Sequence, residues 1–81
     1  MPLDDARVIE IGCGDGRLTR KYANQTRSAL AIDVDRLSVV AARALLPGMR
    51  LASRVDIAQA AAESLPARRE SFDLAIFAWS L

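Results

Sequence analysis

The feature that most constrains this sequence is a glycine-rich stretch between two short apolar runs near the amino terminus. Residues 8–11 are apolar apart from one carboxylate, and they lead into a segment with glycine at every second position, Gly12, Gly14 and Gly16. A second apolar run, residues 29–32, follows and ends in Asp33. A strand, a glycine turn, a helix and a second strand tipped by an acid are typical of a site for a nucleotide-like ligand. Glycine lets the backbone approach the ligand, and the acid can accept hydrogen bonds from ribose hydroxyls.

Two further apolar runs, residues 55–58 and 72–79, bring the number of expected strands to four. All four are more continuous than alternating, which is typical of parallel strands covered on both faces. Segments with helix-like periodicity lie between them. Strands that alternate with helices predict an α/β fold with a Rossmann-like parallel sheet and right-handed crossovers.

The clearest helix is predicted at residues 36–46. Its apolar side chains recur at helical spacing, and we expect them to face the core: Leu37, Val40, Ala41, Ala44 and Leu45. Asp35 is placed to cap the start of this helix, and Pro47 with Gly48 is placed to end it.

The two other connections are predicted to be shorter. Residues 17–24 are predicted to form an amphipathic helix, with Leu18 and Tyr22 one turn apart and a solvated basic side opposite them. The basic side comprises Arg17, Arg20 and Lys21. Residues 60–71 begin with alanines and are interrupted by Pro66, so they allow a short helix or a 3₁₀ turn.

Composition excludes several classes of function. At 81 residues the chain is one small domain at most, and its net charge of +1 provides no electrostatic footprint for nucleic acid or for a membrane surface. Histidine is absent, which argues against a zinc site and against histidine-based catalysis. The single cysteine permits no internal disulfide and suits a reducing compartment. We therefore expect a cytoplasmic protein without metal, nucleic-acid or membrane partners.

Four segments resemble, in order, the motifs of class I S-adenosylmethionine-dependent methyltransferases. Residues 10–16, Glu-Ile-Gly-Cys-Gly-Asp-Gly, resemble the first motif, and residues 31–35 resemble the second, in which an acid ends the second strand. Residues 55–66 are similar to the third-strand segment of the UbiE-like, or type 11, group, and residues 71–81 to the fourth strand and the loop after it. The resemblance implies a sheet in the order 3-2-1-4. It also implies that residues 1–81 form a partial S-adenosylmethionine-binding domain, truncated relative to the family's full sheet.

The resemblance also implies a role for particular residues in binding S-adenosylmethionine. The glycine loop, including Cys13, would lie against the methionine part, Glu10 would meet the ammonium, and Asp33 would accept the ribose hydroxyls. Val34 would pack on the adenine. Where the family commonly has an acid for the adenine amino group this chain has an alanine, so only backbone amides remain for the ring. The full set is Glu10, Gly12, Cys13, Gly14, Gly16, Asp33, Val34, Ala61 and Ala62.

The residues themselves leave alternatives open. A buried Glu10 needs a partner and could pair with a nearby arginine, and Asp33 could cap a helix. The leading hypothesis is the cofactor-binding part of a methyltransferase for small-molecule acceptors, inactive in isolation and with no catalytic residue identifiable. The second is a non-catalytic module that self-associates, or pairs with another chain, through the exposed fourth strand. A weaker third is a fragment of an NAD-dependent oxidoreductase, although the third glycine comes one residue early for that motif.

Overall fold

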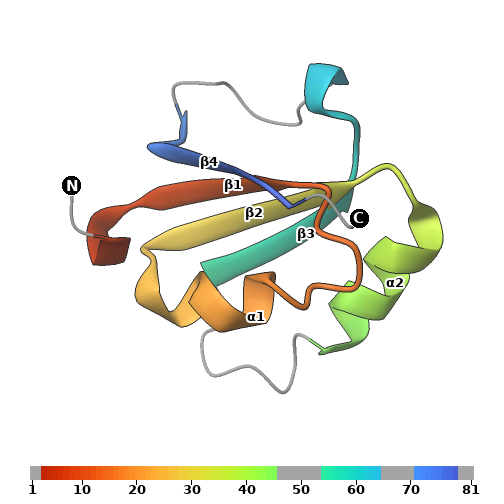
Figure 1. Ribbon diagram of the computed structural model, residues 1–81, viewed down its shortest axis with the longest axis horizontal. Helices are drawn as coiled ribbons and strands as arrows, with labels where there is room; N and C mark the ends of the chain where they lie inside the picture. Colours follow the sequence, from red (N-terminus) through yellow and green to blue (C-terminus); the bar gives the residue numbers. More distant parts are fainter. Residues whose placement is uncertain (1–2, 46–53, 65–70, 79–81) are drawn as a thin grey trace.

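A computed structural model describes residues 3–45, 54–64 and 71–78 and shows one four-stranded sheet (Figure 1). The strands are β1 (Arg7–Ile11), β2 (Ser28–Asp33), β3 (Val55–Gln59) and β4 (Leu74–Phe77). They are hydrogen-bonded in the order β3-β2-β1-β4, and all three pairings are parallel. The predicted fold class and strand order are thus confirmed.

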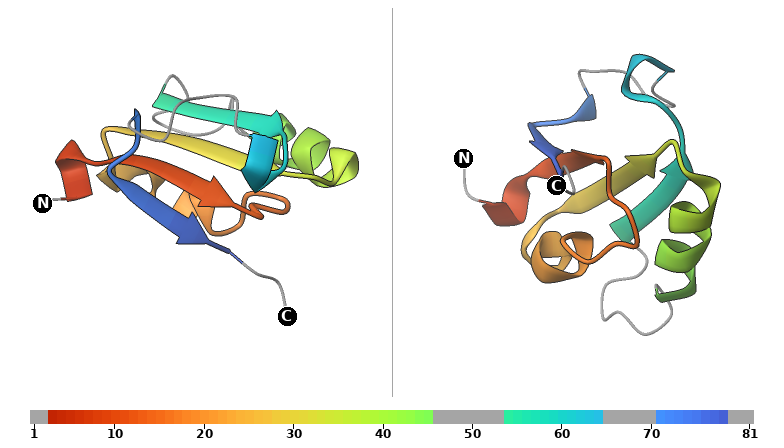
Figure 2. Two further views of the ribbon diagram at one scale, coloured as in Figure 1. Left: turned by 90° about the horizontal axis from the view of Figure 1, so that it is seen from above. Right: turned by 45° about the vertical axis from the view of Figure 1, so that its right-hand side comes forward.

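Two α-helices and three 3₁₀ helices connect or precede the strands. The α-helices are α1 (Thr19–Tyr22) and α2 (Arg36–Leu45), and the 3₁₀ helices are η1 (Leu3–Asp5), η2 (Ala23–Gln25) and η5 (Ala62–Ser64). Both α-helices lie on the same face of the sheet (Figures 1 and 2). The 3₁₀ turn at η5 agrees with the short element predicted between β3 and β4. No helix in these described ranges is long and apolar enough to span a membrane.

The hydrophobic core lies between the sheet and the two α-helices. Strand residues that share this face are in register across β1, β2 and β3, as in the row formed by Val8, Ala29 and Val55. Small and branched apolar side chains from strands and helices fill the layer: Ala6, Val8, Cys13, Tyr22, Ala23, Ala29, Ala31, Val39, Ala42, Val55 and Ile57. Burying these side chains provides the main driving force for folding.

The first helix is shorter than predicted. Instead of a helix over residues 17–24, α1 makes a single turn and passes directly into η2. Tyr22 is buried as expected, but Leu18 is 40% exposed. The glycine loop occupies the residues before Thr19, so the helix begins only after the chain has turned away from β1.

The core-facing side of α2 was predicted wrongly. The helix begins at Arg36 as expected, but the side chains it buries are Val39 and Ala42. Leu37 is 77% exposed and Val40 is 54% exposed. Because seven of the ten residues of α2 are apolar, periodicity alone selected the longer side chains, whereas the small Ala42 permits close approach to the loop. The predicted stop at Pro47 and Gly48 lies outside the described residues.

The prediction that all strands are covered on both faces is only partly met. β1 is buried along its middle, whereas β3 alternates between buried and exposed positions and β4 is largely exposed. Both α-helices pack on one face, and within the described ranges no α-helix covers the other (Figure 2). Trp79, at the end of the fourth apolar run, lies outside the described residues.

Candidate functional site

The loop after β1 depends on glycine at all three predicted positions. Gly12, Gly14 and Gly16 have φ angles of 81°, 57° and 84°, in the region that residues with a side chain rarely adopt. The amides of Gly12 and Cys13 both donate to the Ile32 carbonyl, at 2.9 and 3.0 Å. These bonds fasten the loop to the carboxyl end of β2, which carries the start of the second motif.

The carboxylate of Asp33, in the second motif, is hydrogen-bonded to the glycine loop of the first motif. One oxygen of its carboxylate, Oδ2, accepts a hydrogen bond from the Gly14 amide at 2.8 Å, and Oδ1 accepts one from the Asp35 amide at 2.9 Å. Each carboxylate oxygen can accept more than one hydrogen bond, so acceptor capacity remains for a ligand. The carboxylate is therefore held in a fixed position at the end of β2, beside the glycine loop.

The cap of α2 is Asp35, as predicted, and not Asp33. Asp35 Oδ2 accepts hydrogen bonds from the Ser38 amide at 3.2 Å and the Ser38 hydroxyl at 2.7 Å. These bonds, led by the hydroxyl of Ser38, lower the pKa of the Asp35 carboxyl from its usual value. Asp33 is consequently not needed to start the helix.

Glu10 is completely buried, and its partners are hydroxyl groups rather than an arginine. Its Oε1 accepts hydrogen bonds from Thr19 Oγ1 at 2.5 Å and from Tyr22 Oη at 2.6 Å. Its Oε2 has no hydrogen-bond partner within the described part of the chain. Sequence reasoning missed Thr19 and Tyr22. The signal was available, because an acid inside an apolar strand requires donors and these two residues lie three apart on one helical turn.

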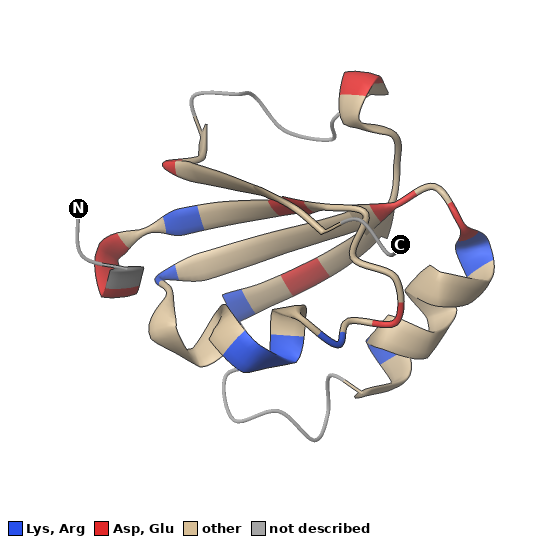
Figure 3. Ribbon diagram, viewed as in Figure 1, with Lys and Arg blue, Asp and Glu red and all other residues tan. Residues whose placement is uncertain are grey.

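The charges around the loop are predominantly negative. Cys13 is 5% exposed, and the pKa of its thiol rises to about 11 because of burial first and then the charges of Glu10, Asp33 and Asp15. Figure 3 shows acidic positions in the loop and at the end of β2, and basic positions on α1. Arg17 approaches Asp15 at 3.6 Å, but both side chains are exposed to solvent. A pKa this high keeps the thiol protonated at neutral pH, which disfavours Cys13 as a nucleophile.

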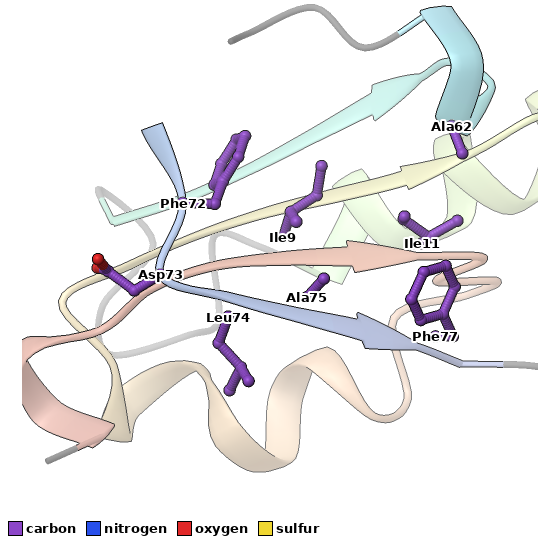
Figure 4. A pocket seen from close by; sticks show the side chains of 8 residues that line it. All are labelled: Ile9, Ile11, Ala62, Phe72, Asp73, Leu74, Ala75 and Phe77. Atoms are coloured by element: carbon purple, nitrogen blue, oxygen red, sulfur yellow. The ribbon is translucent and has the colours of Figure 1, made fainter. Parts of the chain in front are cut away.

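Two open hollows lie beside β1 and β4. The first, of about 520 Å³, is lined largely by the loop and α1: Gly12, Cys13, Gly14, Asp15, Arg17, Leu18, Lys21, Ser38 and Ala78. The second, of about 490 Å³, lies on the sheet face away from the helices (Figure 4). Its lining is mainly apolar: Ile9, Ile11, Ala62, Phe72, Asp73, Leu74, Ala75 and Phe77.

The residues predicted to contact an adenine are at the neighbouring end of β2 and β3. Val34 is 68% exposed, and its carbonyl accepts a hydrogen bond of 3.2 Å from the side chain of Gln59. The Ala60 amide donates to the Asp33 carbonyl at 3.0 Å, which brings the two strand ends together. Ala61 is partly buried and Ala62 is exposed. An apolar surface beside Asp33 is thus open to solvent, whereas no cluster that could hold a metal ion occurs among the described residues.

Comparison with known proteins agrees with this geometry. Residues 8–81 match the family described as a methyltransferase domain. A ubiquinone biosynthesis O-methyltransferase of Sinorhizobium medicae is 33% identical over 75 residues, which is 93% of this chain and 29% of that protein. The chain therefore spans less than a third of the length of this curated relative.

Solved structures show the same fold. The YcgJ protein of Bacillus subtilis is 26% identical with a TM-score of 0.80, over 91% of this chain and 31% of that one. A phosphoethanolamine N-methyltransferase of Haemonchus contortus, solved with phosphoethanolamine and S-adenosylhomocysteine, has a TM-score of 0.82 at 24% identity, over 99% of this chain and 16% of that one. With the family match over residues 8–81, these findings show that the chain belongs to the class I S-adenosylmethionine-dependent methyltransferases.

Proposed function

We propose that this chain forms the S-adenosylmethionine-binding part of a methyltransferase that acts on a small-molecule acceptor in the cytoplasm. The observation that carries the proposal is the contact between the two motifs, in which the carboxylate of Asp33 accepts a hydrogen bond from the Gly14 amide at 2.8 Å. In a sheet ordered 3-2-1-4, ligands bind beyond the carboxyl ends of the strands, where the strand order reverses. The glycine loop and Asp33 lie at that edge.

Several features of the site suit S-adenosylmethionine. Asp33 would hold the ribose hydroxyls, Val34 would lie against the adenine, and the loop from Gly12 to Gly16 would support the methionine part. The bound cofactor supplies an activated methyl group on a positively charged sulfur. Acidic groups near the loop favour such a ligand over the pyrophosphate of NAD, because like charges repel.

In this proposal the described residues bind and orient the cofactor, and none of them is assigned the removal of a proton from an acceptor. Methyl transfer depends above all on holding the acceptor in line with the methyl group, and a base is needed only if the acceptor must lose a proton. We therefore propose that residues 1–81 act as a partial domain, and that acceptor binding requires elements which the longer relatives contain. The isolated chain is expected to bind the cofactor without turning over.

Calorimetric titration tests this proposal. S-adenosylmethionine and S-adenosylhomocysteine should bind the 81-residue chain, and NAD should not. Asp33→Asn removes the charge while keeping one oxygen, and it should weaken binding about tenfold, as expected for the loss of one charged hydrogen bond. Asp56→Asn is the matched control, because Asp56 is exposed in the middle of β3. Binding of NAD without an S-adenosyl response would overturn the proposal.

A second candidate function, self-association through β4, is favoured by the exposure of that strand. β4 pairs with β1 on one side, and within the described ranges no strand pairs with its other side. Leu74 is 43% exposed, and Ala75 next to it is exposed as well. An exposed apolar edge strand is a template for pairing with another chain. We therefore propose that two copies can pair edge to edge through β4.

Light scattering across a concentration series tests this pairing. The chain should associate as its concentration rises, and Leu74→Lys should shift association to at least about tenfold higher concentration, because a charge on an edge strand opposes pairing. Leu37→Lys adds the same charge on α2, where Leu37 is 77% exposed, and should leave association unchanged. A monomer at every concentration, or equal effects of the two substitutions, would contradict pairing through β4.

A further inference from the structure

We infer that Thr19 and Tyr22 are positioning residues that hold the carboxylate of Glu10 in a buried position behind the glycine loop. From there the negative charge of Glu10 favours a cationic ligand without contacting it. This inference rests on the proposed function, because it names how the same site would distinguish the positively charged sulfur of S-adenosylmethionine from the neutral sulfur of S-adenosylhomocysteine.

The side chain of Glu10 is enclosed by protein, and two hydroxyl groups of α1 are hydrogen-bonded to it. Glu10 has no exposed surface, Thr19 is 1% exposed and Tyr22 is 9% exposed. Both hydroxyls donate to the same oxygen, Oε1, at 2.5 and 2.6 Å. Such donors suit an ionised carboxylate, which can only accept hydrogen bonds. Burial, and then the hydrogen bond to Glu10, raises the pKa of Tyr22, so its hydroxyl remains a donor at every physiological pH.

The enclosure also explains why α1 begins where it does. No side chain caps the start of α1, and the helix makes only one turn. A helix of this length is not stable by itself. Thr19 and Tyr22, three residues apart on the same side of the turn, attach it to β1 through Glu10. The loop from Gly12 to Gly16 joins these two elements, so its conformation depends on the same two hydrogen bonds.

The charge of Glu10 reaches the loop although its side chain does not reach solvent. Glu10 is the largest electrostatic cause of the raised pKa of Cys13, ahead of Asp33 and Asp15. A charge surrounded by protein acts over a longer range than one in water, because the medium screens it less. Because Glu10 has no exposed surface, its charge would act on a ligand through the loop rather than by contact.

The first test uses Cys13, which is the sole cysteine, as a reporter in the ligand-free chain. With ¹³C-labelled cysteine, the Cβ resonance should titrate with a pKa of about 11. Glu10→Gln should move this titration to lower pH. The other charges that face the thiol, Asp33 and Asp15, remain unchanged in this variant. Asp4→Asn, in the exposed η1, is the control and should not move it. An unmoved titration in Glu10→Gln would show that Glu10 places no charge at the loop and would overturn the inference.

The second test measures ligand preference. Glu10→Gln should reduce the preference for S-adenosylmethionine over S-adenosylhomocysteine by about fivefold, since a unit negative charge behind the loop is lost. Tyr22→Phe keeps the ring and should change the preference in the same direction, whereas a merely structural role would weaken both ligands equally. An unchanged ratio in both variants overturns the inference. Absence of binding by either ligand contradicts the proposed function instead, and the Cys13 titration then decides the role of Glu10.

Discussion

Glu10→Leu is expected to lower the free energy of unfolding by about 3 kcal/mol, because it removes the shared acceptor of two buried hydroxyls. Leucine fills a similar volume, so the loss comes from the orphaned donors of Thr19 and Tyr22 rather than from a cavity. A chain of 81 residues has little stability to spare. Urea unfolding followed by circular dichroism should therefore show a large shift of the midpoint or a chain that is already unfolded.

The matched control removes the donors as well. Glu10→Leu combined with Thr19→Val and Tyr22→Phe leaves no unpaired hydroxyl, and it should recover most of the lost stability. The recovered variant should still bind S-adenosylmethionine more weakly than the original chain does, because the charge is gone. If Glu10→Leu alone were as stable as the original chain, the hydrogen bonds to Glu10 would not hold α1 in place.

The parallel α/β arrangement of the strands was predictable because several local signals agree, whereas the strand order was implied by the resemblance to the methyltransferase family. Four apolar runs, the glycine loop after the first and the acid after the second all specify the same parallel arrangement, and the structure confirms it. Asp35 was identified as the cap of α2 for the same reason, since capping depends on residues that are close in sequence. Such features can be predicted because few other structures satisfy them.

The orientation of α2 was not predictable in the same way. Its apolar residues surround the helix, so periodicity offers two faces, and the correct one depends on fit against the loop. Ala42 lies near Gly16, where a Cβ built on the glycine would be 3.4 Å from the Ala42 Cβ. Leucine at position 42 would not fit there, whereas Leu37 and Val40 are free to point outward. Close packing between distant segments decided the face, and the sequence pattern does not contain that information.

For Glu10 and Asp33, the sequence predicts the need for a hydrogen-bond partner but not the identity of that partner. The sequence indicates that each acid needs a partner, since Glu10 lies in an apolar strand and Asp33 ends one. Which partner it finds depends on the path of the glycine loop, and that path brings the Gly14 amide to Asp33 and carries Thr19 over Glu10. The sequence therefore predicts which side chains of the site need partners, but the contacts themselves depend on the folded structure.

Gly12→Ala is expected to be the most damaging of the three alanine substitutions in the glycine loop. Gly12 has a φ of 81°, and a Cβ there would lie 3.0 Å from the carbonyl oxygen of Ala78. That oxygen belongs to the backbone, and the amide of the same residue is fixed by a 2.9 Å hydrogen bond to Ile11. The clash therefore pushes β4 away from β1, and we expect a loss of about 3 kcal/mol in the free energy of unfolding.

Gly14→Ala is the matched control for this substitution. Gly14 also has a positive φ, of 57°, but a Cβ there would meet nothing within 4 Å. Only the backbone conformation is strained, so the expected loss is about 1 kcal/mol. Urea unfolding of the two variants side by side measures the difference. Equal losses would mean that the strand ends adjust without cost, and that the end of β4 does not need the close approach that glycine permits at position 12.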